Sequence, residues 1–366
     1  MNGLFRNTYK GKKVLITGHT GFKGSWLCLW LSKMGAEIVG YSIDIPTKPS
    51  HFDLLNLKMT SVKGDILDSK KFYNTIKKHR PDIIFHLAAQ ALVRKSYSKP
   101  VETFETNIMG TVNLFESCRK IKNVKAIVVV TSDKCYQNKE QIWGYREDDA
   151  MGGDDPYSAS KGCTEIVSNS YRKSFFNPLK YNTEHKTLVA NVRAGNVIGG
   201  GDWADDRLIP DIMRATSKGK KVVIRRPNAT RQWQHVLEPL SGYLAVGAKL
   251  LEGKVEFADN WNFGPSDTSN LSVHEVTEHT KKHWDMIKYD IQEDKGNVHE
   301  AHLLKLDSTK AHTKLKWRNI WDSHRTFEKT TTWYKNYYKN KKSLSEIDLE
   351  EYVDDARKSV VNWTQI

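Results

Sequence analysis

The sequence predicts an α/β fold, in which a doubly wound parallel sheet carries a smaller C-terminal cap. Short apolar runs alternate with helical patterns through the first 192 residues. A glycine-rich turn directly follows the first run, and after about residue 192 the alternation gives way to shorter elements. Buried strands separated by helices are typical of βαβ units, whose crossovers are right-handed.

The first half supplies the predicted sheet. Its apolar runs are expected to form strands at 13–17, 37–41, 82–87, 125–131 and 186–192. Helical patterns lie between them at 22–33, 68–79, 101–120 and 156–176. No internal repeat or low-complexity linker is present, which argues against a solenoid or tethered modules.

The second half is expected to form most of the cap. Residues 1–192 would be the nucleotide-binding domain, with a later contribution from about 236–263, and 193–366 mainly the cap. The elements expected there are helices at 205–218, 238–251 and 324–338 and strands at 221–225 and 230–236.

Composition excludes several classes of protein. Of the 366 residues, 39% are hydrophobic and 27% charged, an ordinary globular balance. No run of about 18 apolar residues is present, so we expect no membrane span, and residues 1–13 lack the apolar region of a secretory signal. The four cysteines show no metal-binding spacing, so we expect reduced thiols, no metal and a cytoplasmic location.

The charge is strongly basic. Lysine and arginine number 57 against 43 acidic residues, a formal net charge of +14. The lysines are dispersed and no nucleic-acid-binding motif accompanies them, so we expect no nucleic-acid partner. A polyanionic small molecule, such as a nucleotide diphosphate, would also suit a locally basic cleft.

A dinucleotide site is predicted after the first strand. Gly18, Gly21 and Gly24 form a GxxGxxG turn that opens a helix, where backbone N–H groups can bind a pyrophosphate. Asp44 follows the second strand, 20 residues beyond the last glycine, and can bind ribose hydroxyls. Its carboxylate would repel a 2′-phosphate, which favours NAD over NADP. An ordinary turn aspartate is the competing interpretation.

Tyr157 and Lys161 form the predicted catalytic pair. They lie four residues apart on a predicted helix and therefore on one face of it. A buried lysine cation would lower the pKa of the phenol, which could then take a hydroxyl proton while hydride leaves to NAD. An exposed helix pair is the alternative, but the position behind a fifth strand favours the catalytic role.

These motifs resemble the short-chain dehydrogenase/reductase superfamily, in its extended branch that modifies sugar nucleotides on a Rossmann sheet. Segments 64–66 and 86–90 and the YxxxK at 157–161 carry the likeness. The resemblance implies a set of cofactor-binding residues, namely Gly18, Thr20, Gly21, Phe22, Lys23, Gly24, Asp44, Asp65, Ile66, Ala88, Ala89, Tyr157 and Lys161. It also implies a homodimer built on helices 101–120 and 156–176.

At the end of the fifth strand, Ser132, Asp133 and Lys134 resemble the catalytic trio of sugar-nucleotide 4,6-dehydratases. In that family C4 is oxidised, water is eliminated across C5 and C6, and the hydride returns to C6. The resemblance implies that Ser132 bonds the reacting sugar oxygen and that Asp133 protonates the departing hydroxyl. The usual trio is Thr-Asp-Glu, so either Lys134 or another group abstracts the C5 proton.

Longer segments resemble one subgroup, CDP-glucose 4,6-dehydratase, over roughly residues 10 to 340. These are 18–26, 89–97, 132–136, 143–147, 151–157, 193–203, 207–210, 229–236 and 261–265. The resemblance implies CDP-glucose as substrate, with Asn196, Arg207 and Arg231 binding it; His299 and Glu300 also match, without an assigned role. The competing functions are a sugar-nucleotide 4-epimerase or reductase and a non-catalytic NAD-sensing protein.

Overall fold

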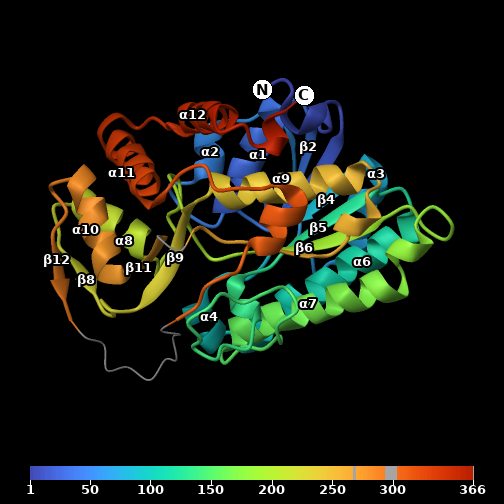
Figure 1. Cartoon of the computed structure of the whole chain (residues 1–366), viewed down its shortest axis with the longest axis horizontal. Coiled ribbons are helices and arrows are strands. Elements are labelled where there is room, and N and C mark those ends of the chain that lie inside the picture. The colour runs from blue at the N-terminus through green and yellow to red at the C-terminus, as the bar shows by residue number, and fades with distance from the viewer. Residues whose placement is uncertain (267–268, 293–302, 366) are drawn as a thin grey trace.

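The computed structural model describes residues 1–266, 269–292 and 303–365, and its centre is a seven-stranded parallel sheet (Figure 1). The strand order is β10-β6-β5-β4-β1-β2-β3. The strands are β1 (Lys13–Thr17), β2 (Glu37–Ser42), β3 (Thr60–Lys63), β4 (Ile83–His86), β5 (Ala126–Val130), β6 (Leu188–Ala194) and β10 (Asn260–Phe263). The predicted fold class is therefore confirmed.

Helices cover both faces of this sheet. One face carries α1 (Phe22–Lys33), α9 (Leu237–Leu251) and α12 (Ser345–Lys358), and the other α3 (Ser69–His79), α6 (Gly110–Ile121) and α7 (Pro156–Ser174). Alternate strand residues serve the two faces, because side chains along a strand point in opposite directions. In β5, Val128 belongs to the core on the α1, α9 and α12 face (the first core). Val129 belongs to the core on the α3, α6 and α7 face (the second core).

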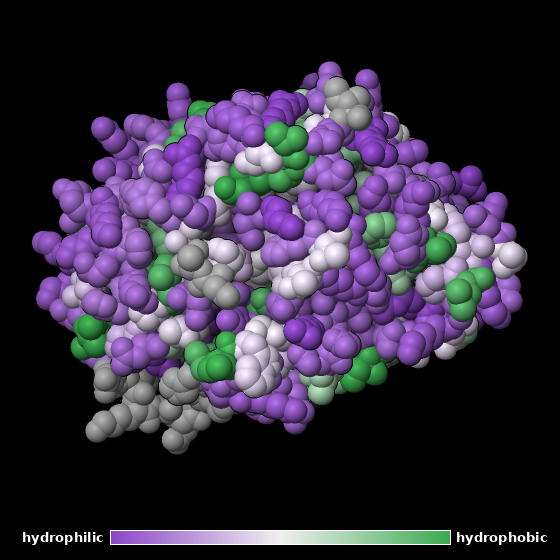
Figure 2. Space-filling model, in the orientation of Figure 1, coloured by the Kyte–Doolittle hydropathy of each residue, from purple (hydrophilic) through white to green (hydrophobic). Residues whose placement is uncertain are grey.

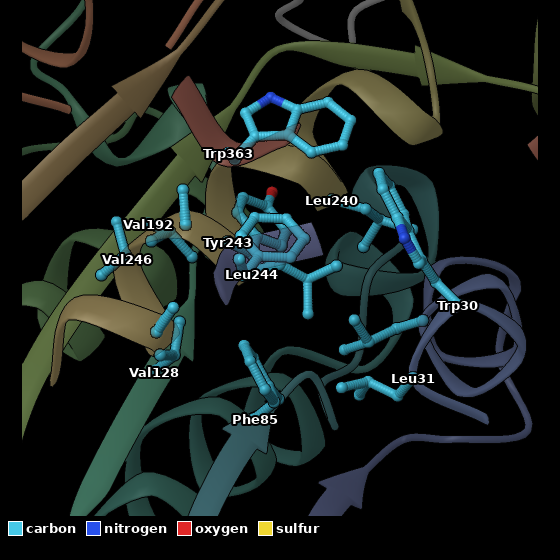
Figure 3. Packing of buried hydrophobic residues seen from close by; sticks show 14 of the residues in the cluster. Trp30, Leu31, Phe85, Val128, Val192, Leu240, Tyr243, Leu244, Val246 and Trp363 are labelled. Carbon is cyan, nitrogen blue, oxygen red and sulfur yellow. The ribbon is translucent and has the colours of Figure 1, made fainter. Parts of the chain in front are cut away.

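The first core is the larger one, and Figure 3 shows part of its packing. Trp30 of α1, Phe85 of β4 and Leu240 of α9 are all fully buried there. Residues from both ends of the chain join them. Trp363 stacks on Phe5, with ring centroids 5.3 Å apart, and the two chain ends lie close together in Figure 1.

The cap lies at one end of the sheet (Figure 1). It contains α8 (Leu208–Ser217), α10 (Val273–His283) and α11 (Ser323–Asn340), a three-stranded sheet of β7 (Asn196–Ile198), β9 (Thr230–His235) and β11 (Asn270–Ser272), and the pair β8 (Val222–Ile224) and β12 (Tyr289–Ile291). Its own core includes Trp203, Trp233 and Trp333. Short helices α2 (His51–Leu55), α4 (Val93–Ser98) and α5 (Pro100–Phe104) complete the helices.

The predicted elements match the structure closely, with two differences. The single helix expected at 101–120 is three pieces, because a π-helical turn at Glu105–Met109 separates α5 from α6. The helix expected from residue 205 begins only at Leu208, since Asp206 has a left-handed φ of 57° that no α-helix accommodates. The domain boundaries stay a prediction; the structure shows α9 and β10 on the main sheet and α12 packed beside α1.

The surface is mostly hydrophilic, with separate apolar spots on the face shown in Figure 2. Within the described ranges, no helix is both long and apolar enough to cross a bilayer.

Candidate active site

The glycine turn forms a tight cradle between β1 and α1. Gly18 has a φ of +73°, and a Cβ there would lie 2.8 Å from the backbone nitrogen of Ala88. A Cβ on Gly24 would lie 2.2 Å from the carbonyl oxygen of Gly18. Only glycine fits at either position, so the first turn of α1 is brought close to the ends of β1 and β4. This geometry fits a pyrophosphate at the helix N-terminus.

The predicted adenosine-binding residues follow the next two strands. Asp44 is exposed just beyond β2, and the Thr20 hydroxyl donates a 2.6 Å hydrogen bond to its carbonyl oxygen, which ties the glycine turn to it. Asp65 follows β3, where its carboxylate accepts a hydrogen bond from the backbone N–H of Leu67 (2.9 Å). Ile66 is a buried core residue packed toward Gly110.

Tyr157 and Lys161 lie in the first turns of α7. Asp155 caps this helix through a 3.0 Å hydrogen bond from the Ser158 backbone N–H, and Pro156 occupies the first turn. Both side chains of the pair are buried. Burial lowers the pKa of Lys161 to about 8, and the Lys161 ammonium donates to the carbonyl oxygen of Val130 (3.4 Å).

The pKa of Tyr157 differs from the expectation. In the chain alone, burial raises it to about 12, although a hydrogen bond with Ser132 lowers it and the Asp133 carboxylate raises it. Desolvation of the phenolate outweighs the stabilising contacts. The predicted lowering by Lys161 is therefore not found in the chain alone.

Ser132 and Asp133 lie where β5 ends. Ser132 caps a short 3-10 turn, Asp133–Cys135, by accepting a hydrogen bond from the backbone N–H of Lys134 (3.3 Å). Its hydroxyl donates to Oδ1 of the buried Asp133 (2.8 Å). Lys134 is only half-buried, and within the described residues no ion pair joins it to Asp133. The structure thus brings the acid and the hydroxyl together beside Tyr157.

Two cations face the same region. Lys23, in the first turn of α1, has its pKa lowered to about 8 by burial, and Arg207 and Lys161 lower it further while Asp133 opposes them. Arg207 pairs with Asp202 (Nη1 to Oδ2, 2.8 Å), which raises the pKa of the guanidinium. These mutual influences indicate that Lys23 and Arg207 lie in the neighbourhood of Asp133.

The other predicted substrate residues belong to the cap sheet. Asn196 lies on β7 and Arg231 on β9, two strands that pair with each other. Arg231 is buried and donates to the carbonyl oxygen of Thr230 (2.7 Å). His299 and Glu300 lie outside the described residues.

Sequence reasoning missed a buried ion pair behind the site. Nε of Arg193 lies 2.8 Å from Oε1 of Glu165, and both side chains are at most 2% exposed. Burial raises the pKa of Glu165, but Arg193 more than reverses this, so it is lowered overall. Two signals were available: Glu165 follows Lys161 by four residues on α7, and Arg193 is the charged residue of a mostly apolar strand.

A family model described as GDP-mannose 4,6 dehydratase matches residues 15–330. The chain is 48% identical over 352 residues to the CDP-glucose 4,6-dehydratase of Salmonella typhimurium, covering 95% of this chain and 98% of that one. It is 30% identical over 281 residues to the dTDP-D-glucose 4,6-dehydratase of Dictyostelium discoideum, covering 72% and 60%.

Solved structures show the same fold. An epimerase of Methanothermobacter thermautotrophicus superposes with a TM-score of 0.79 at 22% identity, covering 91% of this chain and 95% of that one. The dTDP-glucose 4,6-dehydratase of Bacillus anthracis, in complex with NAD, gives 0.72 at 21% identity, covering 89% and 97%. The resemblance drawn from the motifs is confirmed, and the chain belongs to the GDP-mannose 4,6 dehydratase family of enzymes.

Proposed function

We propose that this enzyme converts CDP-D-glucose into CDP-4-dehydro-6-deoxy-D-glucose and water, with NAD held tightly and not consumed. The observation that carries the proposal is the buried Asp133 carboxylate, hydrogen-bonded to Ser132 beside Tyr157. An epimerase or reductase needs the tyrosine and the serine, but it does not expel the C6 hydroxyl and so needs no acid placed to protonate it. The 48% identity to a CDP-glucose 4,6-dehydratase over nearly the whole of both chains supports the same substrate.

The glycine turn fits the cofactor, because Gly18 and Gly24 let the first turn of α1 pack against the ends of β1 and β4, where its backbone N–H groups can bind a pyrophosphate. Asp44 would bind the adenosine ribose and Asp65 the adenine, with Thr20, Phe22, Lys23, Ile66, Ala88 and Ala89 lining the rest. Lys161 would bind the nicotinamide ribose next to Tyr157. When bound, NAD supplies the hydride acceptor for C4 and the hydride donor for C6.

The side chains at the ends of β5 and α7 would move the protons. Tyr157 takes the proton of the C4 hydroxyl, while Ser132 holds the same sugar oxygen. The resulting ketone acidifies the hydrogen on C5. Asp133 then protonates the departing C6 hydroxyl, which leaves as water. Lys134 or another group of the cleft takes the C5 proton and gives it back to C5.

Three residues are proposed to hold the sugar nucleotide. A guanidinium binds phosphate oxygens through two parallel hydrogen bonds, so Arg231 and Arg207 suit the diphosphate. Asn196 can donate to a phosphate or a sugar hydroxyl without adding charge. Lys23 adds to the positive potential of the cleft.

We also propose a homodimer formed through α5, α6 and α7. Val101, Met109 and Ile166 are apolar and about half or more exposed on or between these helices. Light scattering on the purified protein tests this proposal: a mass of one chain only would refute it.

Mass spectrometry of the products tests the function. Purified protein with catalytic NAD is incubated separately with CDP-, UDP- and dTDP-glucose, and we expect loss of one water from CDP-glucose alone. Asp133→Asn should reduce this loss by about 10²- to 10⁴-fold, the range that general acids contribute. Isomerisation without loss of water, or full activity of Asp133→Asn, would contradict the dehydratase. Stoichiometric accumulation of NADH would contradict the return of hydride.

A further inference from the structure

In the proposed reaction, Tyr157 ends each turnover with one proton more and Asp133 with one proton less than at its start. The inference below therefore rests on the proposed function. Glucose loses one water in total, so the protein neither gains nor loses a proton overall. Within a turnover, however, Tyr157 gains the proton of the C4 hydroxyl and Asp133 gives one to the departing hydroxyl. The C5 proton leaves and returns, so it does not alter this balance. Before the next turnover, one proton must pass from Tyr157 to Asp133.

The structure connects these two groups through one hydroxyl. Ser132 Oγ donates to Oδ1 of Asp133 at 2.8 Å and is the side-chain hydrogen-bond partner of the Tyr157 phenol. A serine hydroxyl can accept one hydrogen bond while donating another. A proton can therefore pass along this hydrogen-bonded chain from Tyr157 to Asp133 through a single intermediate hydroxyl, that of Ser132.

Burial isolates this chain from bulk water. Tyr157 and Ser132 are each 8% exposed and Asp133 is 4% exposed. The negative charge of Asp133 raises the pKa of Tyr157 and so disfavours a phenolate there. Lys161 provides no second path for a proton from Tyr157 to Asp133. Its ammonium donates to the carbonyl oxygen of Val130, and a carbonyl oxygen has no proton to pass on.

We propose that Ser132 is the proton bridge that resets the enzyme after each turnover. The O–H bond of Tyr157 breaks as Ser132 Oγ accepts its proton, and the original O–H bond of Ser132 breaks as Oδ1 of Asp133 accepts that one. The two hydrogen bonds, Tyr157 to Ser132 and Ser132 to Asp133, then point the opposite way, with a phenolate at Tyr157 and a neutral acid at Asp133. No solvent proton takes part.

The test compares the first turnover with the later ones. Holoenzyme equilibrated with NAD is mixed with excess CDP-glucose, and product is measured by rapid quench. Ser132→Ala also weakens the contact to the sugar, so its first turnover is slower than that of the unmodified enzyme. During equilibration before mixing, slow exchange with water can still place a proton on Asp133, so the first turnover does not need the bridge. We therefore expect a burst of up to one product per site, followed by turnovers at least 10-fold slower than the first.

Two variants serve as controls. Ser132→Thr keeps the hydroxyl and should show no burst. Tyr243→Phe removes another buried hydroxyl near the site, whose pKa is raised by burial and by Asp133 and Tyr157. This hydroxyl has no hydrogen-bond partner among the described residues, so the variant should also show no burst. If Ser132→Ala does not fold, Ser132→Cys replaces it, because a thiol is a weak donor and acceptor.

Added imidazole or formate sharpens the result. A small buffer that reaches Asp133 should speed the later turnovers of Ser132→Ala and leave its burst rate unchanged. Equal slowing of the first and later turnovers, with no burst and no rescue, would overturn the bridge. If the unmodified enzyme removes no water from any sugar nucleotide, the proposed function itself fails, which is a separate outcome.

Discussion

Two buried glutamates, one behind the active site and one beneath the C-terminal segment, show how differently this fold stabilises a buried acid. Glu165 pairs with Arg193, and its pKa is lowered in spite of burial. Glu238, at the start of α9, accepts hydrogen bonds from the backbone N–H groups of Ile320 and Trp321 and from the hydroxyl of Tyr352. Its pKa is raised by burial to about 7.

The difference separates the effect of a charge from that of dipoles. Neutral donors alone offset only part of the desolvation of Glu238. Glu165 has the Arg193 guanidinium in addition to neutral donors from Thr131 and Asn191, and its pKa is lowered overall. Glu165 lies one turn beyond Lys161 on α7, where a permanent anion raises the pKa of that lysine. Glu238 joins α9 to residues some 80 positions later, so its role is to hold the C-terminal segment on the core.

The largest effect is expected from breaking the ion pair. Glu165→Gln would leave the Arg193 guanidinium buried without a counter-charge, a change that typically costs about 3–5 kcal/mol of unfolding free energy. Urea unfolding measures it. The matched control is the double variant Glu165→Gln with Arg193→Met, which removes both charges and should recover at least half of the loss. If the free energy of unfolding of Glu165→Gln alone lies within about 1 kcal/mol of that of the unmodified protein, this account of the ion pair is contradicted.

A smaller effect is expected from Glu238, and it depends on pH. Its pKa rises from 4.5 to about 7 on folding, so the folded state binds the proton more tightly than the unfolded state. Stability should therefore fall as pH rises from about 4.5 to 7, by on the order of 3 kcal/mol, and stay lowered above that range. Urea unfolding at pH 5 and pH 8 tests this.

Glu238→Gln should make that pH dependence shallower, because the amide has no proton to lose. Part of the slope will remain, since burial also raises the pKa of Asp348 to about 7. A variant with an undiminished slope would show that Glu238 titrates normally in the folded protein.

The smallest effect is expected at an exposed carboxylate. Glu346 of α12 pairs with Lys33 of α1, and both side chains are partly exposed to water. Glu346→Gln should change the free energy of unfolding by less than about 1 kcal/mol, and by less still in 1 M salt. A loss as large as that of Glu165→Gln would mean that the contrast between buried and exposed carboxylates does not hold here.

Sequence patterns predicted the parts of the molecule that depend on local chemistry. The glycine turn, the apolar strands and the Tyr157–Lys161 spacing each follow from short-range rules, and α1 has the bounds expected of it. The partners of Glu165 and Glu238 depend on which distant segments meet. Arg193, a charged residue in a buried strand, indicates that a partner exists but not which one, and nothing in the sequence marks Ile320. Strand β10 and helix α12 also went unpredicted, because β10 is only four residues long and six of the 14 residues of α12 are acidic.

The stacking of Trp363 on Phe5 also bears on how the protein folds as it is made. The first core joins two residues, Phe5 and Trp363, that leave the ribosome 358 positions apart. At about 5–20 residues per second, roughly 20 to 70 s pass between the appearance of Phe5 and that of its partner. Throughout that interval Phe5 and Trp30 lack part of their cover. Apolar surface that stays exposed in this way is prone to aggregation until the C-terminal segment covers it.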